Sequence, residues 1–260
     1  DLSVEGNYHF GAFIFAKFVS MGLNPIISTI LAFAFGTLAG LLTASLFTKL
    51  KIKPILAGIL TMTILYSVNL KTNGKANVPL FSYKSIFDLG PTLVILIIIV
   101  VLIKLCLDLF LKTETGYLLI ATGDNEALVR SLGENSNKYK LIGLMLANGL
   151  VALSGALMAQ YLGFADMTMG NSIIVVALAS IIIGDTIRRN SSLKHTSRAI
   201  IGAISYKIIG GIAIDLGLHP NDLRAINAII VIIFISYNNF ALDLFKSKFN
   251  KGGKDRVENK

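Results

Sequence analysis

Long apolar runs, most of them without a charged side chain, recur along this chain. The run at residues 26–47, IISTILAFAFGTLAGLLTASLF, would form a helix of about 33 Å, enough to cross a hydrocarbon layer of roughly 30 Å. Charged residues make up only 15% of the chain, whereas soluble domains usually carry about 25%. The sequence therefore predicts an all-α, polytopic integral membrane protein.

We interpret eight runs as transmembrane helices, which would put both chain ends on the same side of the membrane. The first run contains Lys17 and is the weakest, and the third follows Pro54 and is short enough to be tilted, broken or re-entrant. Within these runs, Gly36 and Gly40 form a GxxxG pair suited to close helix packing. The runs are 8–22, 26–47, 55–70, 89–103, 141–165, 167–184, 199–216 and 225–242.

Basic residues are distributed unevenly between the connecting loops. With a cytoplasmic C-terminus, 18 of the 24 Lys and Arg residues fall in inside loops and 4 in outside loops, as the positive-inside rule requires. The outside loop 71–86, with three lysines, is the exception. We expect a permease domain at 1–245 and a basic, disordered cytoplasmic tail at 246–260, close to anionic lipid headgroups.

The sequence contains few residues that could bind a metal or form a disulfide. Cys106 is the single cysteine, so internal disulfides and multi-cysteine metal sites are excluded. The three histidines are scattered, and no metal site or bound cofactor is expected. The chain opens at Asp1 without an initiator Met or a signal peptide, which suggests a trimmed N-terminus and possibly a missing first helix.

The polar stretch ATGDNEALVRSLGENSNKYK, residues 121–140, lies between two apolar runs and carries helix signals. Asp124 or Asn125 can cap a helix N-terminus, and Glu126 would then lie in the first turn, where negative charge suits the helix dipole. Gly133 suits the left-handed position that ends a helix. A helix of about two turns is therefore predicted inside a loop.

The predicted short helix would have one polar and one apolar face. Glu126 and Arg130 are four residues apart in the favourable order, and Leu128 and Leu132 share another face. Because so short a helix is unstable alone in water, either its own membrane domain or a partner must hold it. An ordinary surface helix in a loop is the alternative interpretation.

The segment ATGDNEALVRSLGENSNKYKLIGLMLANGLVALSGALMAQ resembles the signature region of bacterial ABC importer permeases of the branched-chain amino acid and ribose type. The sequence departs from the pattern at Ala127, one position early, and at Glu134, where the family often has Ile. The resemblance extends over 25–60 and 170–185. The matching positions are Ala121, Gly123, Asn125, Arg130, Gly133 and Lys140, followed by Ser154, Gly155 and Ala156.

Three shorter pieces, LSVEG, ILAGILTMTILYSVNL and GFADMTMG, look most like the subgroup of tryptophan, tyrosine or related amino-acid permeases. The resemblance implies a cytoplasmic coupling helix that docks on a separate P-loop ATPase, and assigns segment 121–138 to it. It also implies two ATPase copies carrying ATP and Mg, an external substrate-binding protein and a second permease copy. The basic tail is not expected to bind nucleic acid. The coupling residues would be Gly123, Asp124, Asn125, Glu126, Arg130 and Gly133.

Polar residues inside the apolar runs are candidates for the solute path, because polar groups are costly in lipid. Hydrogen bonding between helices is the alternative for the uncharged ones, and snorkelling to the interface is the alternative for the lysine. The candidate path residues are Thr61, Thr63, Asn69, Asn148, Gln160 and Lys207.

Other classes of protein fit less well. A membrane enzyme is disfavoured because HExxH and GxSxG motifs and helically spaced intramembrane carboxylates are absent. A self-contained ABC protein would need a GxxxxGK[ST] loop, which is also absent, so the ATPase must be another chain. An ion-driven secondary transporter, a sugar or nucleoside permease and a membrane scaffold remain open.

Overall fold

The computed structural model describes residues 1–187, 194–215 and the single positions 229, 232 and 236. These residues divide into two compact units, 1–173 and 174–260, which we describe separately. The predicted run 225–242, apart from those single positions, and the tail 246–260 lie outside the described residues.

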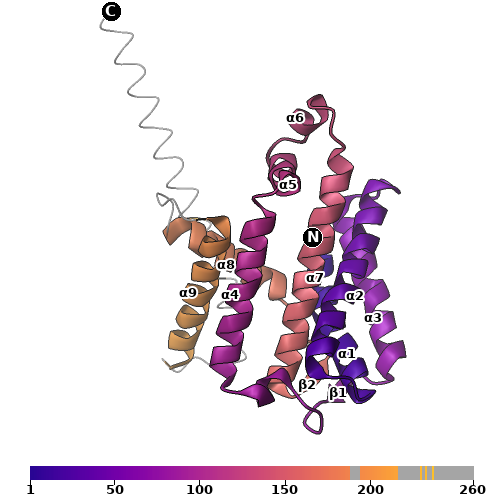
Figure 1. The fold of residues 1–260 in the computed structure, drawn as a ribbon, viewed down its shortest axis with the longest axis vertical. Helices are drawn as coiled ribbons and strands as arrows, with labels where there is room; N and C mark the ends of the chain where they lie inside the picture. The colour runs from indigo at the N-terminus through magenta and orange to yellow at the C-terminus, as the bar shows by residue number, and fades with distance from the viewer. Residues whose placement is uncertain (188–193, 216–228, 230–231, 233–235, 237–260) are drawn as a thin grey trace, which may run out of the picture. The chain divides into compact units, whose positions relative to one another are not determined.

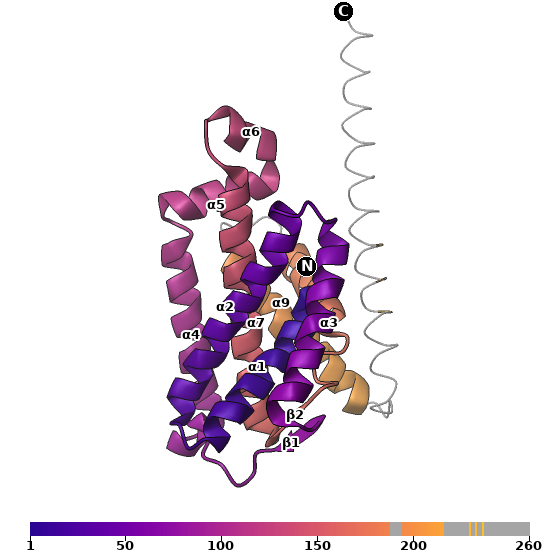
Figure 2. The same ribbon diagram turned by 90° about the vertical axis from the view of Figure 1, so that its right-hand side faces the viewer.

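Four long helices form the core of the first unit, and they lie side by side in both ribbon views (Figures 1 and 2). The first of them is the most buried, and Phe13 and Phe15 on it are 0% and 1% exposed. The four are α1 (Ser3–Ser20), α2 (Pro25–Thr48), α3 (Pro54–Asn73) and α7 (Ser136–Leu162).

Small residues allow these helices to approach one another closely. A Cβ atom added to Gly155 of α7 would lie 1.7 Å from the carbonyl oxygen of Tyr8 in α1. One added to Gly36 of α2 would lie 2.3 Å from Cβ of Ala152 in α7. The GxxxG pair of α2 thus contacts α7 within the chain, as expected for helix packing in lipid.

Short elements close the first unit at its two ends. At one end, β1 (Asn77–Pro79) pairs antiparallel with β2 (Phe164–Asp166), and the short 3-10 helix η1 (Ile86–Leu89) follows β1. At the other end, helices α5 (Glu114–Asp124) and α6 (Glu126–Ser131) precede α7, as Figure 1 shows.

The clearest errors in the predicted boundaries lie around Gly163. The apolar run 141–165 does not continue as one helix, because Gly163 takes the left-handed conformation (φ 76°) and ends α7 at Leu162. The run 167–184 becomes helical only from Ile173, since Met167 to Ser172 form turns. Apolar composition alone did not reveal these breaks.

Helix α4 (Thr92–Phe110) is the most apolar of the long helices and the least buried. The mean hydropathy of its most apolar stretch is 3.1, and only 6% of that stretch is buried. Such a helix suits a surface in contact with lipid. Cys106 is exposed on this helix. Lys104 and Asp108, one turn apart on this helix, form an ion pair with Nζ and Oδ2 2.9 Å apart.

The second unit contains α8 (Ile173–Ile187) and α9 (His195–Asp215) among its described residues. A Cβ atom on Gly202 of α9 would lie 1.8 Å from the carbonyl oxygen of Ser180, so the two helices pack closely. An ion pair of 3.0 Å joins Arg198 to Asp185.

Five helices of the described residues, α2, α3, α4, α7 and α9, are long and apolar enough to cross a membrane. Helix α8 is apolar but shorter than these five. Helix α1 is buried, but its composition is less apolar than that of the five helices. Helix α3 runs unbroken for 20 residues, so this predicted span is not broken. The all-α membrane architecture is confirmed, whereas the number of eight spans is only partly supported.

Candidate functional site

Helix α6 begins with a side-chain cap, as the sequence predicted. Oδ1 of Asn125 accepts a hydrogen bond from the backbone N–H of Leu128 at 3.1 Å. Asp124, the other candidate for this cap, is instead the last residue of α5. Asn125 therefore both ends α5 and starts α6, and its extended backbone (φ −152°) makes the corner between them.

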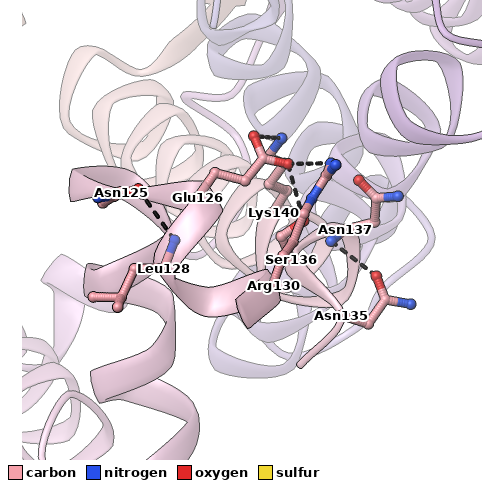
Figure 3. Close-up of polar contacts among 8 residues, drawn as sticks. All are labelled: Asn125, Glu126, Leu128, Arg130, Asn135, Ser136, Asn137 and Lys140. Atoms are coloured by element: carbon pink, nitrogen blue, oxygen red, sulfur yellow. Dashed lines mark hydrogen bonds and ion pairs between the residues drawn. The ribbon is translucent and has the colours of Figure 1, made fainter. Parts of the chain in front are cut away.

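The carboxylate of Glu126 is the centre of the polar network around α6 (Figure 3). Oε1 accepts hydrogen bonds from Nη2 of Arg130 at 2.5 Å and from Oγ of Ser136 at 2.9 Å. Oε2 accepts one from Nζ of Lys140 at 2.6 Å. Because Ser136 and Lys140 belong to the first turns of α7, the network fastens α6 to that helix.

These donors also set the charge state of Glu126. The hydrogen bond from Lys140, followed by those from Ser136 and Arg130, lowers the pKa of Glu126 from 4.5 to about 2. The carboxylate is therefore ionised at every physiological pH, and the network keeps its negative charge.

The end of α6 depends on Gly133, which has a φ of 83°. Its N–H donates to the carbonyl oxygen of Arg130 at 3.0 Å, and the next N–H, of Glu134, donates to that of Val129 at 3.2 Å. This pair of bonds is a Schellman motif, which favours glycine at the left-handed position. The chain can then turn back into α7.

Leu128 of α6 and Leu132, which directly follows this helix, point away from the core of the first unit. Leu128 and Leu132 are 51% and 65% exposed, whereas Val129 is fully buried. In Figure 3, Leu128 points away from the side where Glu126, Arg130 and Lys140 meet. The two leucines therefore do not pack against the core of the first unit.

A cavity of about 370 Å³ lies between α5 and the membrane helices. Gly123 and Lys140 line it together with Phe47 of α2. The ammonium nitrogen of Lys140 lies 5.2 Å from the centre of the Phe47 ring, within reach of a cation–π contact. Lys140 thus links the short helix to α7 and α2 at once.

Asn148, a predicted path residue, lies in the middle of α7 and is fully buried. Its Oδ1 accepts hydrogen bonds from Asn7 at 2.6 Å and from Ser3 at 3.1 Å. Its Nδ2 donates to a carboxylate oxygen of Asp1 at 2.7 Å. These bonds join α7 to α1, so in this conformation Asn148 acts as an interhelical contact.

Two further predicted path residues also bridge separate elements. Gln160 accepts a hydrogen bond from the N–H of Ile86 at 3.0 Å and donates to Thr29 of α2 at 3.0 Å. Thr61 of α3 accepts one from Thr43 of α2 at 3.0 Å. Both residues thus form hydrogen bonds between elements in this conformation, which was the alternative to contact with the solute.

The remaining three candidates lie in different surroundings. Asn69 is 1% exposed, and neither polar atom of its side chain has a partner among the described residues. Thr63 is exposed and donates to the carbonyl oxygen of Ile59 in its own helix. Lys207 is exposed on α9 in the second unit. The five candidates of the first unit therefore have separate surroundings, and Lys207 belongs to the other unit.

The sequence did not single out several buried polar residues of α1 and α2. Asn7 and His9 of α1 are 0% and 3% exposed, and Thr29 contacts Gln160. All three are polar residues in or next to apolar runs, the same signal that identified Asn148. Neither ring nitrogen of His9 has a partner within the described part of the chain.

Comparisons with known proteins identify the family. The family described as "Branched-chain amino acid transport system / permease component" matches residues 1–236. The tyrosine transport system permease protein of Clostridioides difficile is 43% identical over 250 residues, or 95% of this chain and 84% of that protein. The ribose import permease protein RbsC of Escherichia coli is 26% identical over 252 residues, or 92% and 77% of the two chains. No solved structure matches the chain.

The chain therefore belongs to this family of ABC-type transport permeases, as its signature region predicted. It is an integral membrane protein and a transport subunit, not an enzyme. An uncharacterized protein of Rickettsia prowazekii is also similar, with 36% identity over 91% of this chain and 86% of that protein.

Proposed function

We propose that this chain is the permease subunit of a binding-protein-dependent importer and moves an amino acid across the bacterial cytoplasmic membrane. A separate P-loop ATPase supplies the energy, by analogy with the ABC-type permease family to which the chain belongs. An aromatic or branched-chain amino acid is the favoured solute, by analogy with the tyrosine permease at 43% identity.

The observation that carries this proposal is the exposure of apolar side chains on a very short, firmly held helix. Six residues cannot form a stable helix alone, yet Glu126 fastens α6 to α7 through two residues of that helix. The helix then presents Leu128 and Leu132 outward. A rigid polar support beneath an exposed apolar face suits docking to another protein.

The route of coupling follows from the same contacts. A force on α6 passes through Glu126 to Lys140 of α7, and from Lys140 to the ring of Phe47 in α2. Helices α2 and α7 also pack closely at Gly36 and Gly40. Movement of α6 by the ATPase would therefore move the two helices together.

Charge supports a cytoplasmic position for this end of the unit. Lys49, Lys51 and Lys53 follow α2 close to Phe47, which contacts Lys140. By the positive-inside rule, these lysines favour a cytoplasmic position for α5 and α6. In a Cys106→Ser background, a membrane-impermeant maleimide should label Tyr83→Cys in intact cells and Ser131→Cys only after permeabilisation. The reverse pattern would contradict this orientation.

The transport proposal is tested by reconstituting the permease with its ATPase and binding protein in proteoliposomes. Uptake of labelled L-tyrosine or L-leucine should require ATP and should persist when ion gradients are collapsed. Uptake driven by an ion gradient without ATP would favour the secondary transporter instead. Uptake of ribose or a nucleoside, with no amino acid transported, would keep the permease function and change the solute.

A further inference from the structure

A small cavity at the β1–β2 end of the first unit is lined by two opposite charges and several aromatic rings. Its volume is about 240 Å³. The loop after β1 supplies one wall and the last turn of α7 supplies the other. Its lining includes Phe81, Tyr83, Lys84, Asp88, Gln160 and Tyr161.

The loop that forms this cavity is fixed at several points. The N–H of Leu80 donates to the carbonyl oxygen of Gly163 at 2.7 Å, and that of Ile86 donates to Gln160 at 3.0 Å. Ser85 and Asp88 form a reciprocal capping box around η1. Because backbone bonds and caps set the loop, its backbone is fixed before a ligand arrives, and the side chains of Lys84 and Asp88 are exposed and open to a solute.

The two charges in the cavity remain available. Among the described residues, the ammonium group of Lys84 makes no hydrogen bond or ion pair. Oδ2 of Asp88 accepts the N–H of Ser85 at 2.8 Å, and Oδ1 forms no hydrogen bond within the described ranges. Lys84 also belongs to loop 71–86, whose lysines are exceptional for an outside loop.

We propose that this cavity is a binding site for one free, zwitterionic amino acid. Lys84 binds the α-carboxylate, Asp88 binds the α-ammonium group, and the rings of Phe81 and Tyr83 pack against the side chain. Sites for drug-sized ligands usually measure about 300–1,000 Å³, so a smaller cavity suits a single amino acid. A sugar would leave both charges uncompensated, whereas a zwitterion pairs with both.

This proposal rests on the proposed function, since the site would receive the solute at the outer face. Its test uses the full-length permease in lipid nanodiscs and measures binding of L-tyrosine, L-phenylalanine and L-leucine by equilibrium dialysis. Tyramine, which lacks the carboxylate, and 3-(4-hydroxyphenyl)propionate, which lacks the ammonium group, serve as partial ligands. The variants are Lys84→Gln and Asp88→Asn, and the control is Lys75→Gln, an exposed lysine of the same loop outside the cavity.

Lys84→Gln should raise the Kd of L-tyrosine about tenfold, as expected for losing one charge-assisted hydrogen bond, and leave that of tyramine unchanged. Asp88→Asn should raise the Kd of L-tyrosine by a similar factor and leave that of 3-(4-hydroxyphenyl)propionate unchanged. Because the asparagine side chain can still accept the N–H of Ser85, this variant should keep the cap of η1. Lys75→Gln should have no effect. Equal Kd values for wild type and Lys84→Gln would overturn the proposal, as would no binding of any of the three amino acids.

ATP-driven uptake by the reconstituted transporter is measured in parallel. This second measurement distinguishes failure of the proposed binding site from failure of the proposed transport function. Normal uptake of an amino acid without direct binding to the permease would reject the cavity as a site and leave the function standing. Failure of ATP-driven uptake for every amino acid would reject the proposed function itself.

Discussion

Glu126 connects more partners around α6 than any other side chain drawn in Figure 3. Its two carboxylate oxygens accept from three donors, two of them on α7. The sequence predicted only the pair with Arg130, because four-residue spacing is visible along a helix. The contacts with Ser136 and Lys140 cross a turn, so they depend on the corner that Gly133 makes.

Lys140 offers a direct test of this network. Lys140→Met should remove the ion pair with Glu126 and lower solute uptake per ATP hydrolysed by about fivefold or more, a usual size for coupling between sites. Lys140→Arg should keep most of the coupling, because a guanidinium can bind the same carboxylate. The ratio is measured in proteoliposomes, with protein amount matched. Unchanged coupling in Lys140→Met would exclude this residue from the route.

The charge state of Glu126 gives a prediction for pH. Since folding lowers its pKa from 4.5 to about 2, its stabilising contribution is complete above about 4.5 and is lost as pH falls towards 2. The segment should therefore show no titration of Glu126 between about pH 5 and 8. Carbon-13 NMR of labelled glutamate should locate the pKa, and Lys140→Met should raise it. A wild-type value at or above 4.5 would contradict the network.

At the scale of elements, the chain's apolar runs predicted most helices but not their ends. Helix α7 stops at Gly163 and α8 begins at Ile173, although the residues between are almost uncharged. The segment Phe164–Asp166 instead pairs with β1, far away in sequence. Such pairing depends on tertiary contacts, which hydropathy cannot reveal.

The turn after α6 can be tested through Gly133. Gly133→Ala should destabilise the turn by about 1 kcal/mol, because left-handed backbone is unfavourable for residues with a Cβ atom. Gly133→Pro should act more strongly, since proline cannot adopt this φ and loses the N–H that donates to Arg130. Both variants should reach the membrane yet transport less per ATP.

Gly22→Ala is the matched control for Gly133→Ala. Gly22 also has positive φ (86°), and a Cβ atom there would meet nothing within 4 Å. It lies between α1 and α2, away from α6, so the same backbone strain should leave ATP coupling intact. Transport unaffected by Gly133→Pro would show that the turn has no role in coupling.

At the scale of the whole molecule, family membership and membrane class could be predicted from the sequence, while the solute path could not. The signature residues 121–140 are contiguous, so a pattern can detect them. Path residues come from several helices, and polarity alone grouped Asn148, whose bonds join α1 and α7, with Lys207 on the second unit. A second permease copy stays a prediction, because its contacts involve surfaces beyond one chain.

The most direct measurement is affinity purification of the tagged full-length chain from gently solubilised native membranes, with copurifying proteins identified by mass spectrometry. A soluble P-loop ATPase should copurify with the wild type and be lost from Leu128→Asp/Leu132→Asp, because charges would replace the exposed apolar face of α6. The variant should remain in the membrane at normal levels, since neither leucine is buried. Absence of an ATPase from the wild type, or equal recovery with the variant, would contradict docking through α6.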